Sequence, residues 1–232
     1  MNRPRLLDLF CCEGGAAVGY DRAGFEVVGV DLEPRFAKRY PFEFRQGDAI
    51  EFVKEHGHEF DVVHASPPCQ RYSITNAARH EYPDLIGPTR DALIATGKPW
   101  VIENVVGAPL IDATTLCWSM FCKAGSVIDD DGTPLRMERH RQFETNWTLH
   151  SPCKCAHPKG VQVAGSYGGA RRDKWEAKHV RKGGYVPSVA VQQELLGIDW
   201  MTQYGMYQSI PPVYSAYVGL KLMATLTESE AV

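Results

Sequence analysis

The 232-residue sequence lacks long apolar runs and carries no strong excess of charge of either sign. No run approaches the ~18 apolar residues that a membrane-spanning helix needs, so we expect no membrane span and no membrane partner. The N-terminal residues meet charge too early for a signal peptide. A formal net charge of −3 provides no global attraction to nucleic acid. Any contact with nucleic acid must therefore come from a local basic patch.

The pattern of cysteines also argues against a disulfide framework. The chain has seven cysteines, an odd number, and two of them are adjacent, Cys11 and Cys12. This usage favours a reducing compartment. Hydrophobic content of 44% and charged content of 23% are typical of globular proteins, and no internal repeat or low-complexity tract stands out. We expect a cytoplasmic, monomeric protein.

Short apolar runs alternate with helical stretches in the first half of the chain. Strands are expected at 6–10, 27–30, 44–46, 61–65 and 100–103, and helices at 16–23, 34–40, 48–56 and within 84–96. Strands interleaved with helices predict a doubly wound α/β fold of the Rossmann type, with a mostly parallel sheet and right-handed crossovers. Ligands of such folds bind at the carboxyl ends of the strands.

From about residue 106 this alternation stops. Residues 129–134 predict a turn, and we expect a hairpin between 125–128 and a strand near 141–143. Residues 148–187 show little periodicity and predict a loop-rich insert. Helices are expected again at 188–196 and 212–226.

Two strand ends carry the residues with the most chemical information. Pro67-Pro68-Cys69-Gln70 follows the strand expected at 61–65, and the two prolines stiffen the loop that presents the thiol. Glu103 and Asn104 end the strand that begins near Trp100. A thiol and a carboxyl group at neighbouring strand ends can act as a nucleophile and a proton donor.

A second group of residues predicts a nucleotide-like ligand. The first expected strand runs into a turn of small residues, ending in Gly14-Gly15, that opens a helix. Asp31 ends the second strand about twenty residues later, where an acid can bond ribose hydroxyls. Asp48 follows the third strand, where an adenine amino group could be met. The competing interpretation of each feature alone is a turn or a solvated acid.

Taken together, these motifs resemble those of the DNA (cytosine-5) methyltransferases, in a short form similar to bacterial or phage members. Asp8-Leu9-Phe10 with Gly14-Gly15 looks like their motif I, which binds S-adenosylmethionine, although Cys12 stands where the family usually has glycine. The resemblance implies S-adenosylmethionine as cofactor. The implied cofactor-binding residues are Asp8, Phe10, Cys11, Cys12, Gly14, Gly15, Asp31, Leu32, Asp48, Ala49 and Pro67.

The resemblance also assigns catalytic roles. Cys69 matches the nucleophile that adds to C6 of a flipped cytosine, and Glu103 matches the acid that meets N3. Arg139 and Arg141, within 137–143, look like the arginine motif that stabilises the thiolate and clamps cytosine O2, and we expect both to lie on one face of a strand. Residues 1–145 and 188–232 then form the catalytic domain, and 146–187 form a small target-recognition insert.

The insert carries the basic patch that DNA binding requires. Between 165 and 184 the basic residues exceed the acidic ones by four, with aromatic residues interleaved. Double-stranded DNA is the expected partner, with a cognate restriction endonuclease as a second one. The expected DNA-binding residues are Gln70, Ser73, Arg171, Arg172, Lys174, Lys178, Arg181 and Lys182. So small an insert predicts a target of two to four base pairs.

Three alternatives stay open. The same site could act on tRNA cytosine, or the chain could be a catalytically silent DNA-binding relative, given its substitutions at Cys12, Met137 and Gln208. A zinc cluster of Cys117 and Cys122 with Cys153, Cys155 and His157 has enough ligands. Its spacing is unusual, so the sequence favours unliganded cysteines and we expect no metal.

Overall fold

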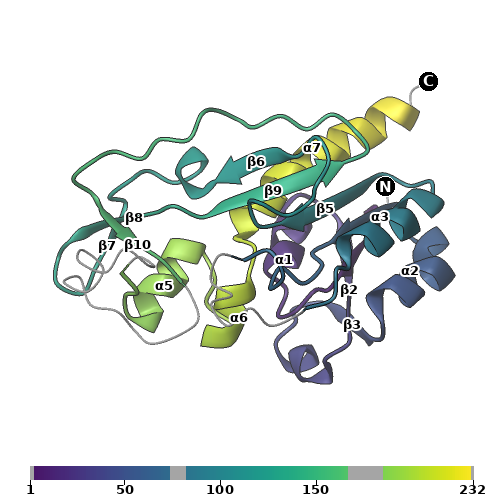
Figure 1. Ribbon diagram of the computed structural model, residues 1–232, viewed down its shortest axis with the longest axis horizontal. Helices are drawn as coiled ribbons and strands as arrows, with labels where there is room; N and C mark the ends of the chain where they lie inside the picture. Colours follow the sequence, from purple (N-terminus) through teal and green to yellow (C-terminus); the bar gives the residue numbers. More distant parts are fainter. Residues whose placement is uncertain (1–2, 74–81, 167–184, 231–232) are drawn as a thin grey trace.

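The computed structural model describes residues 3–73, 82–166 and 185–230, and its centre is a seven-stranded sheet (Figure 1). The strand order is β3-β2-β1-β4-β5-β9-β6. The first five strands are parallel, and β9 runs antiparallel to both of its neighbours. These strands are β1 (Arg5–Leu9), β2 (Glu26–Asp31), β3 (Glu43–Gln46), β4 (Val62–Ala65), β5 (Trp100–Asn104), β6 (Thr114–Cys117) and β9 (His140–Thr145). The predicted α/β class and mostly parallel sheet are confirmed.

Helices cover both faces of this sheet. Alternate residues of β1 point to opposite faces, so Leu6 packs with α1 (Gly15–Arg22) and α7 (Pro212–Glu230). Leu7 packs on the other face with α2 (Ala49–His56) and α3 (Ile86–Ala95). Two hydrophobic cores therefore hold the parallel strands rigid from either side, and the strand ends stay free for a site.

A second, three-stranded sheet lies beside the main one, in the order β10-β8-β7 (Figure 1). It consists of β7 (Val127–Ile128), β8 (Pro134–Met137) and β10 (Gln162–Ala164). The helices α5 (Val189–Leu196) and α6 (Gln203–Gln208) lead from this end of the molecule back toward α1. Because β10 pairs with β8, the segment after residue 146 is joined to residues that precede it in the chain.

The predicted hairpin has a different second strand. The turn after β7 leads into β8, with Asp129 and Thr133 paired across it and Gly132 at φ +83°. A turn this tight returns the chain at once, so the next residues pair with β7. The strand that carries Arg141 is β9, which pairs with β5 and β6 instead. The expected pairing of 125–128 with a strand near 141–143 is therefore wrong.

The helix expected at 34–40 is also shorter than predicted. It is a 3₁₀ helix, Pro34–Lys38, followed by a buried Tyr40 whose ring contacts Gly29 and Asp8. The chain must leave the helix to bury this ring, which explains the early end. Two further 3₁₀ turns occur at Gly57–Glu59 and Trp118–Met120.

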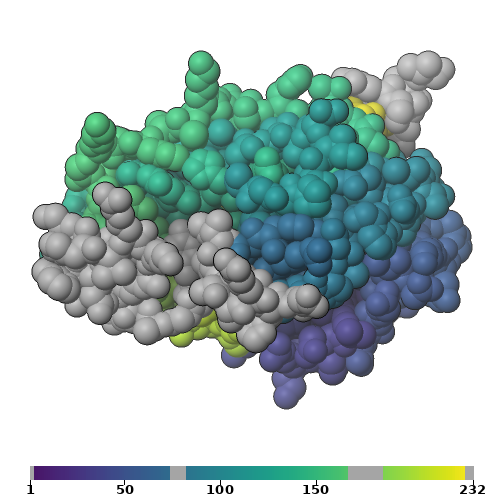
Figure 2. Space-filling model, viewed as in Figure 1, coloured from purple at the N-terminus to yellow at the C-terminus, as the bar shows by residue number. Residues whose placement is uncertain are grey.

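On the face shown in Figure 2, the purple and blue residues of the first part of the chain lie at the lower right, and the green residues of about 130–165 lie along the upper side. Among the described residues, no helix combines the length and the apolar character that a bilayer crossing requires.

The close contact of α1 with α7 depends on Gly19. A Cβ at this position would lie 2.0 Å from Ser215 Oγ and 2.2 Å from the Pro212 carbonyl oxygen. We predict that Gly19→Ala lowers the free energy of unfolding by about 1–3 kcal/mol, since the two helices must separate. Gly47→Ala is the control, because its Cβ meets nothing closer than 4.0 Å. Urea denaturation measures both, and equal stabilities would contradict the packing.

Candidate active site

The carboxyl ends of β1, β4 and β5 meet at one edge of the sheet, since these strands are parallel neighbours. Ser66, directly after β4, donates its backbone N–H to the Leu9 carbonyl at the end of β1 (3.1 Å). The loop with the half-buried Cys69 continues from there, and Glu103 lies at the end of the adjacent strand. The structure therefore brings the predicted thiol and acid to the same edge.

A buried hydrogen bond fixes the thiol loop against the strand of the acid. Asn104 donates its side-chain amide to the Pro67 carbonyl (2.8 Å). After Cys69 the loop closes, because the N–H groups of Tyr72 and Ser73 both donate to the Cys69 carbonyl (3.0 Å each). The loop is thus held on both sides of the thiol.

Glu103 is a buried carboxyl group with a cationic partner. Its side chain is 6% exposed, and its Oε1 lies 2.9 Å from Arg141 Nε. Burial raises the pKa of Glu103 above its ordinary value, against the lowering effects of Arg141, Arg139 and a hydrogen bond from Ser66. A carboxyl group with a raised pKa holds a proton more readily, as a general acid must.

A chain of buried hydrogen bonds leads toward Glu103 from the core. Tyr20 Oη lies 2.9 Å from His64 Nδ1, and His64 Nε2 lies 2.8 Å from Ser66 Oγ. Burial lowers the pKa of His64 to about 3, so its imidazole is neutral at neutral pH. Ser66 and the hydrogen bonds that connect it to His64 and Tyr20 were not predicted from the sequence, although Ser66 stands directly before Pro67.

Arg139 and Arg141 make different contacts. Arg141 lies in β9 and pairs with Glu103. Arg139 precedes β9, and its buried guanidinium donates to the carbonyls of Ser166 (3.1 Å), Tyr207 (3.0 Å) and Ser209 (2.7 Å). Arg139 thereby ties three distant segments together. The prediction that both arginines lie on one strand is wrong for Arg139, because β9 begins at His140.

Burial also decides the state of the thiol. The pKa of Cys69 is raised, first by burial, even though Arg141 and Arg139 act to lower it, and the charge of Glu103 raises it further. The arginines therefore lower the pKa of Cys69, as expected, but their effect is smaller than that of burial. In the free protein the thiol keeps its proton at neutral pH.

A cleft lies next to this edge, between the glycine turn and the α6 region. Five of the predicted cofactor residues line it, namely Asp8, Phe10, Cys11, Cys12 and Gly15. Other lining residues come from the strand end and from the α6 region, including Ser66, Met201, Gly205 and Gln208. Of these, Met201 and Gly205 were not predicted, since no spacing signal in the sequence connects them to the turn.

The glycine turn has left-handed backbone at three positions. Phe10, Cys12 and Gly14 have φ of 58°, 50° and 86°. Cys12 therefore adopts the left-handed conformation that glycine reaches at lowest cost. Its N–H donates to Asp31 Oδ2 (3.0 Å), and the other oxygen of Asp31 accepts from Glu33 N (3.0 Å). These bonds place Asp31 against the turn.

Glu13 ties this turn to the C-terminal segment. Its carboxylate accepts hydrogen bonds from the Thr202 N–H and hydroxyl (2.7 Å each), and its carbonyl accepts from Trp200 Nε1 (2.8 Å). A Cβ on Gly205 would lie 2.3 Å from Glu13 Oε2, so a side chain there would displace the Glu13 carboxylate from Thr202. Sequence reasoning missed this contact, because it joins residues almost two hundred positions apart.

Asp8 lies beneath the cleft. It is 1% exposed and accepts a hydrogen bond from Tyr40 Oη (3.2 Å). Burial raises its pKa to about 7, against the lowering effect of the Tyr40 bond.

The remaining predicted residues lie outside the cleft lining. Asp48 caps α2, since its Oδ1 accepts from Ile50 N and Glu51 N (2.9 and 3.0 Å). Leu32 is 64% exposed, and Ala49 is buried at the start of α2. Gln70 and Ser73 flank the thiol loop. The expected DNA contacts Arg171, Arg172, Lys174, Lys178, Arg181 and Lys182 lie outside the described residues.

The structure groups the candidate metal ligands differently from the sequence. Cys117, Cys155 and His157 come together with His140, which was not considered as a ligand. Cys122 and Cys153 do not belong to this group.

The strand order and the helices on both faces of the sheet define a Rossmann-like α/β fold, and the comparisons with known proteins find the same fold. The model of the C-5 cytosine-specific DNA methylase family matches residues 4–88, which include the glycine turn and Cys69. The S. pombe Dnmt2 methyltransferase shares the fold, with a TM-score of 0.58 over 97% of this chain and 99% of that one, at 12% identity. Residues 4–88, less than half of the chain, are thus similar to the C-5 cytosine-specific DNA methylase family.

Two type II methyltransferases are similar in sequence. M.XorII from Xanthomonas oryzae is 28% identical over 46% of this chain and 29% of its own length. M1.HphI from Haemophilus parahaemolyticus is 29% identical over 34% of this chain and 24% of its own length. The chain thus matches less than a third of the length of either relative.

The environment of Cys69 predicts a pH dependence. Alkylation of Cys69 by iodoacetamide should rise with a midpoint above 9.0, the ordinary thiol value, because burial raises its pKa. Glu103→Gln removes a negative charge and should lower the midpoint, whereas Arg141→Gln removes a positive charge and should raise it. Peptide mapping after timed labelling measures all three. A wild-type midpoint below 9.0 would contradict the assigned balance.

Proposed function

We propose that the protein transfers a methyl group from S-adenosylmethionine to C5 of cytosine in double-stranded DNA. The observation that carries the proposal is the junction of the Cys69 loop with Glu103 and Arg141, fixed by the hydrogen bond from Asn104 to Pro67. A nucleophilic thiol and a proton-holding carboxyl group at one strand edge are what this reaction needs.

Cytosine C5 is a weak nucleophile, so the ring must first be activated. Cys69 Sγ gives up its proton and adds to C6, while Glu103 donates a proton to N3, which makes C5 electron-rich. S-adenosylmethionine, when bound, would supply the methyl group to C5, and its S–CH3 bond would break to leave S-adenosylhomocysteine. A water then takes the C5 proton, and the electrons of the C5–H bond restore the ring double bond and expel the Cys69 thiolate from C6. N3 returns its proton to Glu103.

Arg141 has two roles in this scheme. Its guanidinium holds the Glu103 carboxyl group in place, and its charge favours the thiolate that burial alone opposes. Arg139 acts as a positioning residue, since its donors are bound to the carbonyls of three segments.

We assign S-adenosylmethionine to the cleft beside the site on the chemistry of its lining residues. Its lining combines the open glycine turn and the end of β4, and Asp31 stands at the turn. When bound there, this cofactor supplies an electrophilic methyl group. Gly14 and Pro67 adjoin lining residues in the sequence, whereas Leu32 and Ala49 follow Asp31 and Asp48. Asp48 keeps one oxygen outside its cap bonds to α2.

The target base must leave the duplex, because C6 is not accessible to a thiol within the stack. We assign DNA recognition to residues 146–187 together with the small sheet, because β10 from this segment pairs with β8 before it. Gln70 and Ser73 stand next to the thiol, where a flipped base and its neighbours would pass. The basic residues between 171 and 182 would then neutralise phosphates.

Further expectations stay predictions: a partner restriction endonuclease, a monomeric state, and a cytoplasmic location in a bacterial or phage-infected cell. A short recognition sequence of two to four base pairs is likewise a prediction.

The proposal is tested by nucleoside mass spectrometry of unmethylated DNA incubated with the protein and S-adenosylmethionine. We predict 5-methylcytosine with the wild-type protein and none with Cys69→Ser, since a hydroxyl is a much weaker nucleophile. Glu103→Gln should reduce the rate by roughly 10²-fold or more, the usual effect of a lost general acid.

Cys122→Ser is the matched control, because this half-buried cysteine is not among the residues that line the cleft, and we expect it to leave the rate unchanged. Parallel incubation with unmodified tRNA separates the two nucleic acids. Methylation of tRNA alone would overturn the DNA substrate. Methylation of neither, by a protein that binds DNA, would favour the silent relative.

A further inference from the structure

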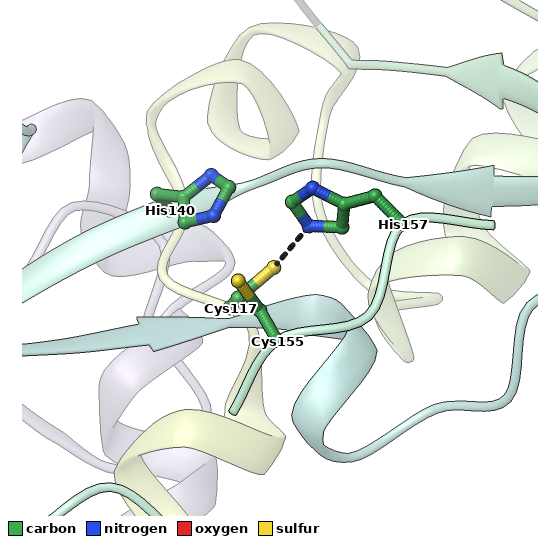
Figure 3. Close-up of side chains that lie close together, drawn as sticks. All are labelled: Cys117, His140, Cys155 and His157. Atoms are coloured by element: carbon green, nitrogen blue, oxygen red, sulfur yellow. Dashed lines mark hydrogen bonds between the residues drawn. The ribbon is translucent and has the colours of Figure 1, made fainter. Parts of the chain in front are cut away.

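A group of four metal-binding side chains lies at the start of β9, outside the cleft (Figure 3). Cys117, His140, Cys155 and His157 each offer one ligand atom, and these atoms all lie within 4.8 Å of one another. Figure 3 shows both imidazoles and both sulfur atoms directed toward a shared space between them. Two thiols and two imidazoles are a donor set that Zn²⁺ prefers.

Two of the ligands are brought together by strand register. Cys117 ends β6 and is the direct cross-strand partner of His140 in β9. Directly opposed residues of an antiparallel pair project to the same face, with their Cβ atoms about 5 Å apart. The pairing of the main sheet therefore places a thiol beside an imidazole before any metal is bound.

The other two ligands come from a single short segment. Cys155 and His157 are separated by Ala156, whose N–H donates to Ser119 Oγ (3.0 Å) and docks the segment beside β6. His157 Nε2 then lies 3.2 Å from Cys117 Sγ. Tetrahedral zinc requires about 3.3–3.8 Å between ligand atoms, given its usual bond lengths, so small side-chain movements complete the geometry.

The residues around the group fit a bound cation. His157 turns its Nδ1 toward the Glu138 carboxylate (3.8 Å), as zinc-ligating histidines do with their second nitrogen. Ser119 Oγ donates to Cys117 Sγ (3.3 Å), a contact that supports a thiolate. We propose that Cys117, His140, Cys155 and His157 bind one structural Zn²⁺ ion.

A bound ion would also fix the start of β9, the strand that carries Arg141. Neighbouring strand residues project to opposite faces, so His140 would be held on the face opposite to Arg141. The ion would join β6, the start of β9 and residues 155–157, which begin the proposed recognition region. It would thus fix the point at which β8 of the small sheet leads into the main sheet, without taking part in the reaction.

The test is the zinc content of the full chain, purified without chelators and measured by inductively coupled plasma mass spectrometry. We expect one zinc ion per chain in the wild type and a loss of most of it in Cys155→Ser and His157→Asn. Cys153→Ser and Cys122→Ser are the matched controls and should keep the ion. Cys153 and Cys155 are both exposed and two positions apart, so the comparison separates ligation from general damage.

Cobalt substitution provides a readout on the unaltered chain. The Co²⁺ form should show the visible bands of a tetrahedral ion and a thiolate charge-transfer band, and zinc should abolish both. Full zinc retention by Cys155→Ser, or no binding of either ion by the folded wild type, would overturn the proposal. So would a Cys117–Cys155 disulfide in reduced preparations. None of these results depends on methyl transfer, so the zinc site and the proposed function can fail separately.

Discussion

The buried hydrogen bond from Asn104 to the Pro67 carbonyl is the constraint on which the site depends. It joins the end of β5 to the loop after β4, and so fixes the distance between the thiol and the acid. Parallel pairing brings the strand ends near each other but leaves the loop free. The two prolines and the turn that closes on the Cys69 carbonyl remove that remaining freedom. The relative position of Cys69 and Glu103 is thus set mostly by the backbone.

Burial and charge oppose each other at this edge. Burial raises the pKa of both Cys69 and Glu103, which favours a protonated thiol and a protonated acid. Arg141 opposes both shifts from its position 2.9 Å from Glu103. The neutral acid suits proton donation to N3, whereas the neutral thiol does not suit attack. The charge of Arg141 therefore favours the reactive thiolate but works against the protonated acid, and a polar substrate entering the site would change the balance.

The first half of the fold was predictable from the sequence because its strands and helices are short, apolar and regularly spaced. The thiol, the acid and the glycine turn were also predictable, since each follows a strand directly. Contacts across long sequence separations were not, such as Glu13 with Thr202 or Arg139 with Ser209. The pairing of β9 was not predictable either, because the turn at Gly132 pairs β7 with β8 and leaves β9 to pair with β5. His140 could not be predicted as a metal ligand, because only the register of β6 and β9 places it opposite Cys117.

The central claim is that the Cys69 sulfur bonds to the target cytosine. The most direct measurement uses a duplex pool with 5-fluorocytosine in place of cytosine, together with S-adenosylmethionine, because fluorine at C5 cannot leave as a proton does. The account predicts a protein–DNA complex that survives denaturation, with its cross-link mapped by peptide mass spectrometry to Cys69. A cross-link at another residue, or none from a preparation that methylates unmodified DNA, would contradict it.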